Sequence, residues 1–510
     1  MSAQAPPRHV APRTRERADI AAFRARVERI LSAPEVSRGY WGLFIQDADT
    51  GEVLFAQNAD RYFLPASNAK LFTAALALAT LGPDYRFHTT IVTRAAVDAN
   101  GALQGDLVLV GRGDPSLSNR KVPFESRTAR DGPPEKVLAE LADAVAARGV
   151  KQITGDVVAD DSYFSSGAYP SGWAIDDMLW NYGVPVSAIE INEGALSIEL
   201  RPTESAGAPA FFTSDSLAGV YQIHNLITTG LRGSEQKLAV EREPASPDIF
   251  LRGTMPVGAQ PRTLVIAIDR PADYAAALLK NLLEARGIQV TGRARALHSG
   301  NFGAEFTPSP VGARADEATV LAEHVSLPLA ETLRVMDKVS QNLHAELLLR
   351  TAAREKTGDA TADAAIQFEE DFRTSIGITD AGAIMTDASG LSRKDMVTPQ
   401  SEAMLLRWAA KQPWYEIFRA SLPIAGVDGT LTDRMAHTPA AEHIWAKTGS
   451  LSHVDSLAGY ATTTRGAHLV FSFIANNHNL KGRAATDVLD SLALAMIEDL
   501  GTNKSCCAKH

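Results

Sequence analysis

The chain has 510 residues, which is longer than a single hydrophobic core usually organises, so two or three domains are expected. Hydrophobic residues make up 45% of the sequence and charged residues 22%, a composition typical of globular proteins. The net charge of −10 argues against nucleic acid as a main partner, and no apolar run reaches the ~18 residues of a transmembrane segment.

The two ends of the chain contribute little to a core. Residues 1–19 are rich in Pro, Arg and Ala, and we expect a disordered segment there. They lack the apolar stretch of ~7–15 residues that a signal peptide needs, so no export signal is visible in this sequence. The only cysteines, Cys506 and Cys507, are adjacent in a polar tail over 503–510 and cannot staple the fold. Cysteine usage therefore does not decide the compartment.

A helix and a β-hairpin are predicted ahead of the first motif. Apolar residues recur at helical spacing over 21–31, and β-rich runs over 40–47 and 52–56 flank an Asp-Thr-Gly turn. After Pro65, a long helical pattern begins, with one apolar face made of Leu71, Ala74, Ala75, Leu78 and Leu81.

Ser67 and Lys70 lie in the first turn of that predicted helix, three residues apart and on one face. A buried lysine with a lowered pKa can take the proton of a serine hydroxyl, and the helix N-terminus favours the developing anion. A capping serine followed by a surface lysine is the simpler interpretation of so short a motif. Ser118 and Ser234 also precede a lysine by three residues, but neither opens a long apolar helix.

The middle of the chain is predicted to mix helices and strands without a catalytic group of its own. Strands are expected over 88–94 and 107–110, and helices over 134–148 and 272–286. Short β segments separated by Gly and Pro turns fill most of 185–297.

Ser340 and Asn342 lie within a long helical pattern over 329–356, near a predicted break between two helical segments. The two side chains can reach one cleft only if the backbone there forms a loop or short turn. Two polar residues on a solvated helix face remain an equal alternative for this pair alone.

Residues 443–450 form a predicted strand, and two further strands follow over 457–461 and 468–475 at hairpin spacing. A closing helix is expected over 488–500. Within the first strand, Lys-Thr-Gly supplies a cation, a hydroxyl and a glycine that lets a substrate approach the backbone. The same letters at 356–358 end a helix, where the glycine is a C-cap.

Three motifs therefore follow one another in the order known for serine β-lactamases and penicillin-binding proteins: Ser67-x-x-Lys70, Ser340-x-Asn342 and Lys447-Thr448-Gly449. On these residues the chain resembles the D-alanyl-D-alanine carboxypeptidase/endopeptidases, class C low-molecular-mass penicillin-binding proteins with large insertions. The resemblance covers about residues 20–500. Further stretches that support it are Gly111–Pro115, Gly155–Phe164, Asp387–Arg393 and Gly426–Leu431.

The resemblance implies an α/β (α+β) fold, with a β-lactamase-like catalytic domain of an antiparallel sheet flanked by helices and two smaller inserted domains. Far more residues separate Ser67 from Ser340 than in a plain β-lactamase, so the insertions are placed there. The expected boundaries are 20–85 and 311–502 for the catalytic domain, 86–115 and 182–310 for one insert, and 116–181 for a nested second insert.

The roles of the first two motifs follow from the resemblance and from general chemistry together. Ser67 is expected to attack the carbonyl between two D-alanines or of a cross-link, while Lys70 takes the Ser67 proton. Ser340 is expected to relay a proton towards the leaving amine and to link Lys70 to Lys447. Asn342 is expected to hold the substrate amide.

The third motif is expected to bind the substrate at its end. Lys447, Thr448 and Ser450 would face the terminal carboxylate beside Gly449, with Arg393 as a rival cation for a substrate carboxylate. The backbone N–H groups of Ser67 and Ser450 would form the oxyanion hole.

No metal or other cofactor is expected, because no His/Cys/Asp cluster in the sequence has ligand spacing. The expected partners are peptidoglycan stem peptides and, as covalent inhibitors, β-lactam antibiotics; the oligomeric state is left open. The resemblance places the protein in the periplasm or cell envelope. One alternative is a β-lactamase, and the long insertion argues against it. The other is a non-catalytic peptidoglycan-binding protein, and the presence of all three motifs argues against that.

Overall fold

The computed structural model describes residues 17–165, 167–299 and 318–501. Most of the predicted disordered N-terminal segment and the whole cysteine-containing tail lie outside these residues. The last residues of that N-terminal segment already belong to the first helix, α1 (Ala18–Leu31). None of the helices in the described part of the chain is long and apolar enough to cross a membrane.

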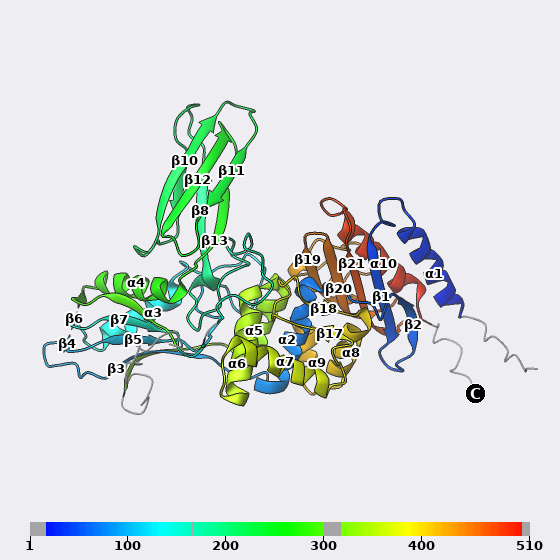
Figure 1. Ribbon diagram of the computed structural model, residues 1–510, viewed down its shortest axis with the longest axis horizontal. Coiled ribbons are helices and arrows are strands. Elements are labelled where there is room, and N and C mark those ends of the chain that lie inside the picture. Colours follow the sequence, from blue (N-terminus) through cyan, green and yellow to red (C-terminus); the bar gives the residue numbers. More distant parts are fainter. Residues whose placement is uncertain (1–16, 166, 300–317, 502–510) are drawn as a thin grey trace, which may run out of the picture.

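A five-stranded antiparallel sheet joins the two ends of the sequence (Figure 1). Its strand order is β19-β20-β21-β1-β2, so the predicted N-terminal hairpin and the three predicted C-terminal strands form one sheet. The strands are β1 (Tyr40–Asp47), β2 (Val53–Gln57), β19 (Ile444–Leu451), β20 (Val454–Thr462) and β21 (His468–Asn476).

Both faces of this sheet are buried, as the alternation along β1 shows. Leu43 and Ile45 pack in one hydrophobic cluster with α1 and with α10 (Ala484–Asp499). Phe44, between them, points to the opposite face and packs in the cluster that contains the helices next to the site. The sheet is therefore a rigid central layer, and its edge strand β19 is the strand that carries Lys447.

The helices on the second face lie in the middle of the molecule in Figure 1. The polypeptide enters α2 through a 3-10 turn, and a π-helical turn separates α5 from α6 at the predicted break. These elements are η1 (Ala66–Ala69), α2 (Lys70–Leu81), α5 (Leu329–Val335), the π-helical turn (Met336–Ser340), α6 (Asn342–Thr357), α7 (Ala362–Ser375), α8 (Pro399–Ala409), α9 (Tyr415–Ser421), η6 (Gly429–Leu431) and the short strands β17 (Ala383–Ile384) and β18 (Met396–Val397).

A second five-stranded sheet lies at the far end of the molecule, with α3 and α4 packed on one face (Figure 1). Its strand order is β15-β7-β5-β3-β16, and a small sheet of β14, β6 and β4 lies beside it. The elements are β3 (His88–Thr93), β4 (Ala102–Leu103), β5 (Leu107–Val110), α3 (Lys136–Ala147), β6 (Gln152–Ile153), β7 (Val157–Asp160), α4 (Pro271–Glu284), β14 (Gln289–Val290), β15 (Ala294–Leu297) and β16 (Thr319–Val325).

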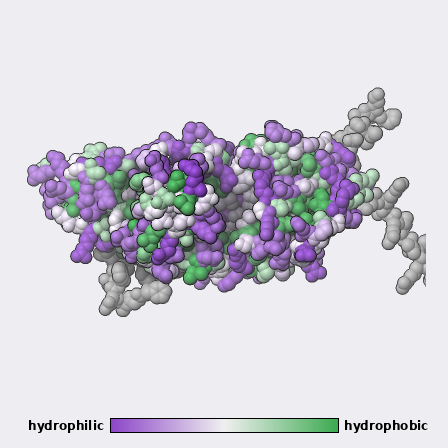
Figure 2. Space-filling view, turned by 90° about the horizontal axis from the view of Figure 1, so that it is seen from above, coloured by the Kyte–Doolittle hydropathy of each residue, from purple (hydrophilic) through white to green (hydrophobic). Residues whose placement is uncertain are grey.

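Two three-stranded sheets project from the molecule, with orders β10-β12-β11 and β13-β8-β9 (Figure 1). From above, hydrophobic residues appear on this face as small scattered groups among hydrophilic ones (Figure 2). The elements are η2 (Asn192–Gly194), β8 (Ala195–Arg201), β9 (Phe211–Ser214), β10 (Gln222–Gly230), β11 (Lys237–Glu241), β12 (Asp248–Pro256) and β13 (Arg262–Ala267).

The expected domain boundaries stay a prediction, but the sheet pairing groups some strands differently from them. β7, from the segment predicted as a nested insert, pairs with β5 and β15 of the segment around it. β16 follows residue 311 yet pairs with β3, because its backbone completes the edge of the outer sheet.

Candidate active site

Ser67 lies in the 3-10 turn that leads into α2, as its place in the first turn of a predicted helix requires. The turn is held from below by Ser456, whose hydroxyl donates to the carbonyl of Pro65 (2.7 Å). Nine consecutive residues of α2, from Lys70 to Leu78, are buried, so the helix is fixed in the core by apolar packing. Ser67 itself is half-buried and sits at the helix N-terminus.

Lys70 is fully buried, and its ammonium group makes three hydrogen bonds. The Nζ atom donates to Ser67 Oγ (2.9 Å), to Asn342 Oδ1 (2.7 Å) and to the carbonyl of Ser389 (2.6 Å). Burial lowers the pKa of Lys70 to about 8, although the nearby carboxylates, with Asp387 first, raise it again in part. Lys70 is therefore a buried amine whose pKa lies close to neutral pH and whose nitrogen touches a serine hydroxyl.

Lys447 and Ser340 form a second lysine–serine pair. Lys447 Nζ donates to Ser340 Oγ (2.9 Å) and to the carbonyl of Thr448 (2.7 Å). Burial, followed by the positive charges of Lys70 and Arg127, lowers the pKa of Lys447 well below its ordinary value. Ser340 ends the π-helical turn with a φ of 66°, a left-handed conformation that directs the next residue out of the helix.

The structure brings the first two motifs together with one difference from the predicted contacts. Ser340 contacts Lys447, but the side chain of the second motif that bonds Lys70 is Asn342. The amide nitrogen of Asn342 donates to the carbonyl of Tyr182 (2.8 Å), so both ends of this side chain have protein partners. Its predicted role towards the substrate amide stays a prediction.

The third motif lies on the edge strand β19, which passes next to the backbone of Ser67 at Gly449. A Cβ atom built on Gly449 would come within 2.9 Å of the Ser67 nitrogen and 2.2 Å of Ser456 Oγ, so only glycine fits here. The Thr448 hydroxyl donates to Thr430 Oγ1 (2.7 Å), and the exposed Ser450 hydrogen-bonds to Asp455.

Arg393 is exposed, and its charge lowers the pKa values of Asp177 and Tyr182, which burial raises. The predicted site residues are thus split between a buried lysine cluster and a peripheral cation. Of the two alternative serines, Ser118 is buried beside Arg120, whose backbone nitrogen donates to its hydroxyl, and Ser234 is exposed.

Within the stretch Asp387–Arg393, sequence reasoning assigned a role to Arg393 alone and not to the part of the loop that contacts Lys70. Asp387 accepts hydrogen bonds from the Gly390 and Ser392 nitrogens and from the Trp173 indole, and this fixes the loop. The loop carbonyl that meets Lys70 belongs to Ser389, a main-chain contact that no side-chain motif announces. The Asp-x-Ser-Gly run itself does predict a turn of this kind.

Two buried carboxyl groups near the lysines also escaped the sequence-based prediction. Burial raises the pKa of Asp337 to about 7, and the Ser421 hydroxyl and the lysine charges hold it lower than burial alone would. Burial and the charge of Asp387 raise the pKa of Glu346 to about 8. The site therefore holds several groups that change charge near neutral pH, which is characteristic of catalytic centres.

A serine next to a buried lysine on a helix, facing an edge strand with a second lysine, defines the class of serine acyl-transfer enzymes that includes penicillin-binding proteins and β-lactamases. The model of the D-Ala-D-Ala carboxypeptidase 3 (S13) family matches residues 23–496, and the chain belongs to this family. It is therefore a serine-type D-Ala-D-Ala carboxypeptidase, and the family and activity predicted from the sequence are confirmed.

Individual relatives agree with this assignment. The D-alanyl-D-alanine carboxypeptidase of Actinomadura sp. (strain R39) is 34% identical over 490 residues, covering 94% of this chain and 85% of that protein. The carboxypeptidase DacB of Haemophilus influenzae is 27% identical over 457 residues, covering 86% of this chain and 85% of that protein. The crystal structure of penicillin binding protein 4 (dacB) from Haemophilus influenzae superposes with a TM-score of 0.77 at 25% identity, covering 92% of this chain and 98% of that one. The predicted fold class is thereby confirmed.

Proposed function

We propose that Ser67 is the nucleophile of this carboxypeptidase and that Lys70 is its general base. The observation that carries the proposal is the 2.9 Å contact between Lys70 Nζ and Ser67 Oγ at a buried amine whose pKa is lowered to about 8. The carboxypeptidase activity itself follows from the family, and the assignment of its steps to these residues rests on this geometry.

The three hydrogen-bond partners of Lys70 orient the lone pair of its neutral amine. A neutral amine has two N–H donors and one lone pair. Asn342 Oδ1 and the Ser389 carbonyl can only accept, so they take both N–H groups. The lone pair is then left for the third partner, the Ser67 hydroxyl, whose proton moves to Lys70 as Oγ attacks the substrate carbonyl.

The second lysine–serine pair supports departure of the D-amino acid. Ser340 Oγ accepts a hydrogen bond from Lys447 Nζ, so its own hydroxyl proton is available to the leaving nitrogen. Protonated Lys447, together with the hydroxyl groups of Thr448 and Ser450, favours the terminal carboxylate at this end of the site. When Ser340 gives up its proton, Lys447 can replace it and becomes neutral as the product leaves. The backbone N–H groups of Ser67 and Ser450 are assigned to the oxyanion hole.

We further propose that the substrates are peptidoglycan stem peptides and, through the same acyl-enzyme, cross-links that end in a D-centre. β-Lactams would acylate Ser67 because they present a strained amide to the same nucleophile. The family, and the crystal structure of penicillin binding protein 4 (dacB) from Haemophilus influenzae complexed with a β-lactam, support this proposal. The place of action that fits such substrates is the periplasm or cell envelope.

Fluorescent penicillin tests the proposal. Wild type should become covalently labelled, the label should be released slowly, and mass spectrometry should place the ester on Ser67. Rapid release would indicate a β-lactamase, and absence of label would indicate a non-catalytic peptidoglycan-binding protein.

A further inference from the structure

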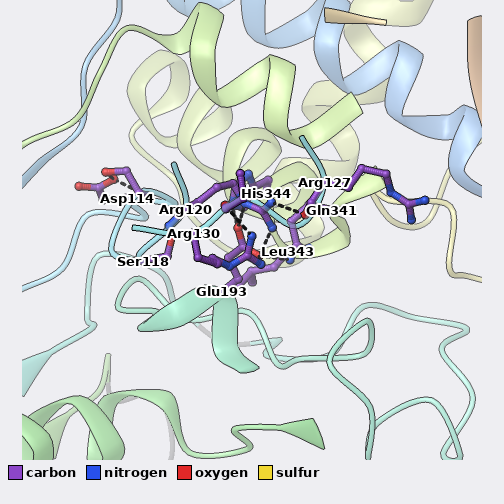
Figure 3. A network of polar contacts seen from close by, with 11 residues as sticks. Asp114, Ser118, Arg120, Arg127, Arg130, Glu193, Gln341, Leu343 and His344 are labelled. Atoms are coloured by element: carbon purple, nitrogen blue, oxygen red, sulfur yellow. Dashed lines mark hydrogen bonds and ion pairs between the residues drawn. The ribbon is translucent and has the colours of Figure 1, made fainter. Parts of the chain in front are cut away.

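The middle residue of the second motif, Gln341, is tied to the inserted part of the chain. Its Oε1 accepts from the Leu343 nitrogen (2.9 Å) and caps α6. Its Nε2 donates to Glu193 Oε2 (3.2 Å), a residue of η2 in the inserted region. Figure 3 shows these side chains meeting below the start of α6. Gln341 thus connects the turn between Ser340 and Asn342 to a distant segment.

Glu193 is itself held by a buried, bidentate ion pair with Arg120. Arg120 Nε lies 2.5 Å from Glu193 Oε1, and Arg120 Nη2 lies 2.6 Å from Oε2, with both side chains at most 7% exposed. Burial alone would raise the pKa of Glu193, but the hydrogen bonds and charge of Arg120 lower it to about 2. The acceptor that faces Gln341 is therefore a carboxylate at any working pH.

The neighbours of the pair do not compete for this carboxylate. His344 Nε2 is 3.7 Å from Glu193 Oε1, and burial lowers the pKa of His344 to about 4, so its ring is neutral. Arg130 reaches only to 3.9 Å of Glu193 Oε2. Arg120 is consequently the main charge partner of Glu193, and Gln341 is its remaining hydrogen-bond donor.

The backbone beside Gln341 needs such support. Ser340 has a φ of 66°, and a non-glycine residue in this conformation is strained unless its surroundings fix it. The two residues that flank Gln341 each bond one lysine of the site, Ser340 to Lys447 and Asn342 to Lys70. A small rotation of this turn would move both contacts together.

We propose that the Arg120–Glu193 ion pair is a positioning device for the second motif, acting through Gln341 on Ser340 and Asn342. The inference deepens the proposed function and rests on it. Arg120, Glu193 and Gln341 are positioning residues, since none of them touches the reacting atoms. The inserted region would then contribute to the chemistry by holding the turn that carries Ser340.

Exchange of the amide and the carboxylate tests the device. Gln341→Glu keeps the acceptor for the Leu343 nitrogen, removes the donor to Glu193 and places two carboxylates in contact. The second-order rate of penicillin acylation should fall by about 10–100-fold, as expected for a small displacement of a catalytic group. Glu193→Gln alone breaks the ion pair with Arg120 and should lower the rate similarly, and the double variant should be no slower than the slower single variant, because both changes act through one contact.

Glu369→Gln is the matched control, because Glu369 forms a buried ion pair with Arg373 (2.7 Å) on α7. It should lower the melting temperature and leave the acylation rate unchanged when all variants are assayed well below their melting temperatures. Wild-type acylation in either single variant, or losses that multiply in the double variant, would overturn the inference. A wild type that is never acylated would refute the proposed function, and this inference with it.

Discussion

The two lysine–serine pairs of the site have the same contact distance but are built differently. Ser67 and Lys70 are three residues apart on one helical segment, so local backbone geometry alone places them 2.9 Å apart. Ser340 and Lys447 are also 2.9 Å apart, but they come from a strained π-helical turn and the edge strand of a sheet. The first pair therefore depends on a helix, whereas the second depends on the tertiary structure around it.

The two lysines also differ in their hydrogen-bond partners and in the charges that shift their pKa values. Lys70 has three hydrogen-bond partners that fix its nitrogen, whereas Lys447 has two, the Ser340 hydroxyl and the carbonyl of Thr448. After burial, the positive charge of Lys70 is the next cause of the lowered Lys447 pKa. Because each charge disfavours the other, a change at one pair is expected to alter protonation at the other.

The largest expected effect separates the two pairs by role. Ser67→Ala should reduce penicillin acylation by at least ~10⁴-fold, because the group that forms the ester is gone. Ser118→Ala and Ser234→Ala, at the two other Ser-x-x-Lys positions, should acylate at the wild-type rate. The measurement is the time course of fluorescent penicillin labelling with mass spectrometry of the adduct. An ester on Ser118 or Ser234 would disprove the assignment of the nucleophile.

Loss of the second serine should be smaller than loss of the first. Ser340→Ala removes a proton relay but leaves the nucleophile and base, so acylation should fall by about 10²–10⁴-fold. Both substrates must protonate the nitrogen of the broken C–N bond, but peptide substrates should suffer more than penicillin, because ring strain drives cleavage of the β-lactam and makes it less dependent on a positioned acid. Equal losses for peptide and penicillin would argue against a relay at Ser340.

The first pair could be predicted from the sequence because a helix period and an apolar face fix it. The sequence also located the Lys-Thr-Gly strand and the helical break near Ser340, since both have local patterns. The sequence did not reveal that Asn342 contacts Lys70, nor that Glu193 and Tyr182, from the inserted region, bond the second motif. These contacts join segments far apart in the chain and include a main-chain carbonyl, which has no side-chain signature.

The terminal carboxylate of the substrate gives the next largest effect. A substrate ending in a D-alanine amide should lose the equivalent of ~1.5–3 kcal/mol of charge-assisted hydrogen bonding at the Lys447 end of the site. Lys447→Met should shrink the difference between acid and amide substrates in kcat/KM. Arg393, the exposed cation whose charge acts on Tyr182, is the competing residue.

A double-mutant cycle with Lys447→Met and Arg393→Ala separates the two cations. If the preference for the acid substrate survives in Lys447→Met but disappears in Arg393→Ala, the terminal carboxylate binds at Arg393 and our assignment to Lys447 is wrong.

The pH dependence of acylation should report the first pair. Lys70 acts only as the neutral amine, so the rate should rise as pH rises through its pKa of about 8. Between pH 7 and 9 the neutral fraction, and with it the rate, should increase about tenfold. The buried Glu346 titrates in the same range, so the profile is also measured in Glu346→Gln. Because the charge of Glu346 raises the pKa of Lys70, the rise should persist in that variant with its midpoint at lower pH. Loss of the rise over the whole accessible pH range would assign it to Glu346.

The smallest expected effect concerns Arg127, which belongs to the inserted loop and affects the second pair. Its carbonyl accepts from Arg120 Nη1 (3.1 Å), and its exposed side chain extends away from the Glu193 network in Figure 3. Its charge contributes to the lowered pKa of Lys447, which places it within electrostatic reach of that lysine. In a chain of net charge −10, an exposed cation here should help an anionic substrate to approach.

Arg127→Gln should therefore slow acylation by anionic penicillin about 2–5-fold at low ionic strength, and ~0.5 M salt should remove the difference, because exposed charges are screened. Arg127→Lys should retain the wild-type rate, since the charge alone is required. Arg201→Gln, on β8, makes the same change in net charge elsewhere and should have no effect. If both Gln variants slow acylation equally, net charge is responsible, and the second pair receives no specific assistance from the inserted loop. If only Arg127→Gln slows acylation and salt abolishes the effect, the inserted region supplies charge as well as position to the end of the site that holds Ser340 and Lys447. The helical pair of Ser67 and Lys70 needs neither contribution.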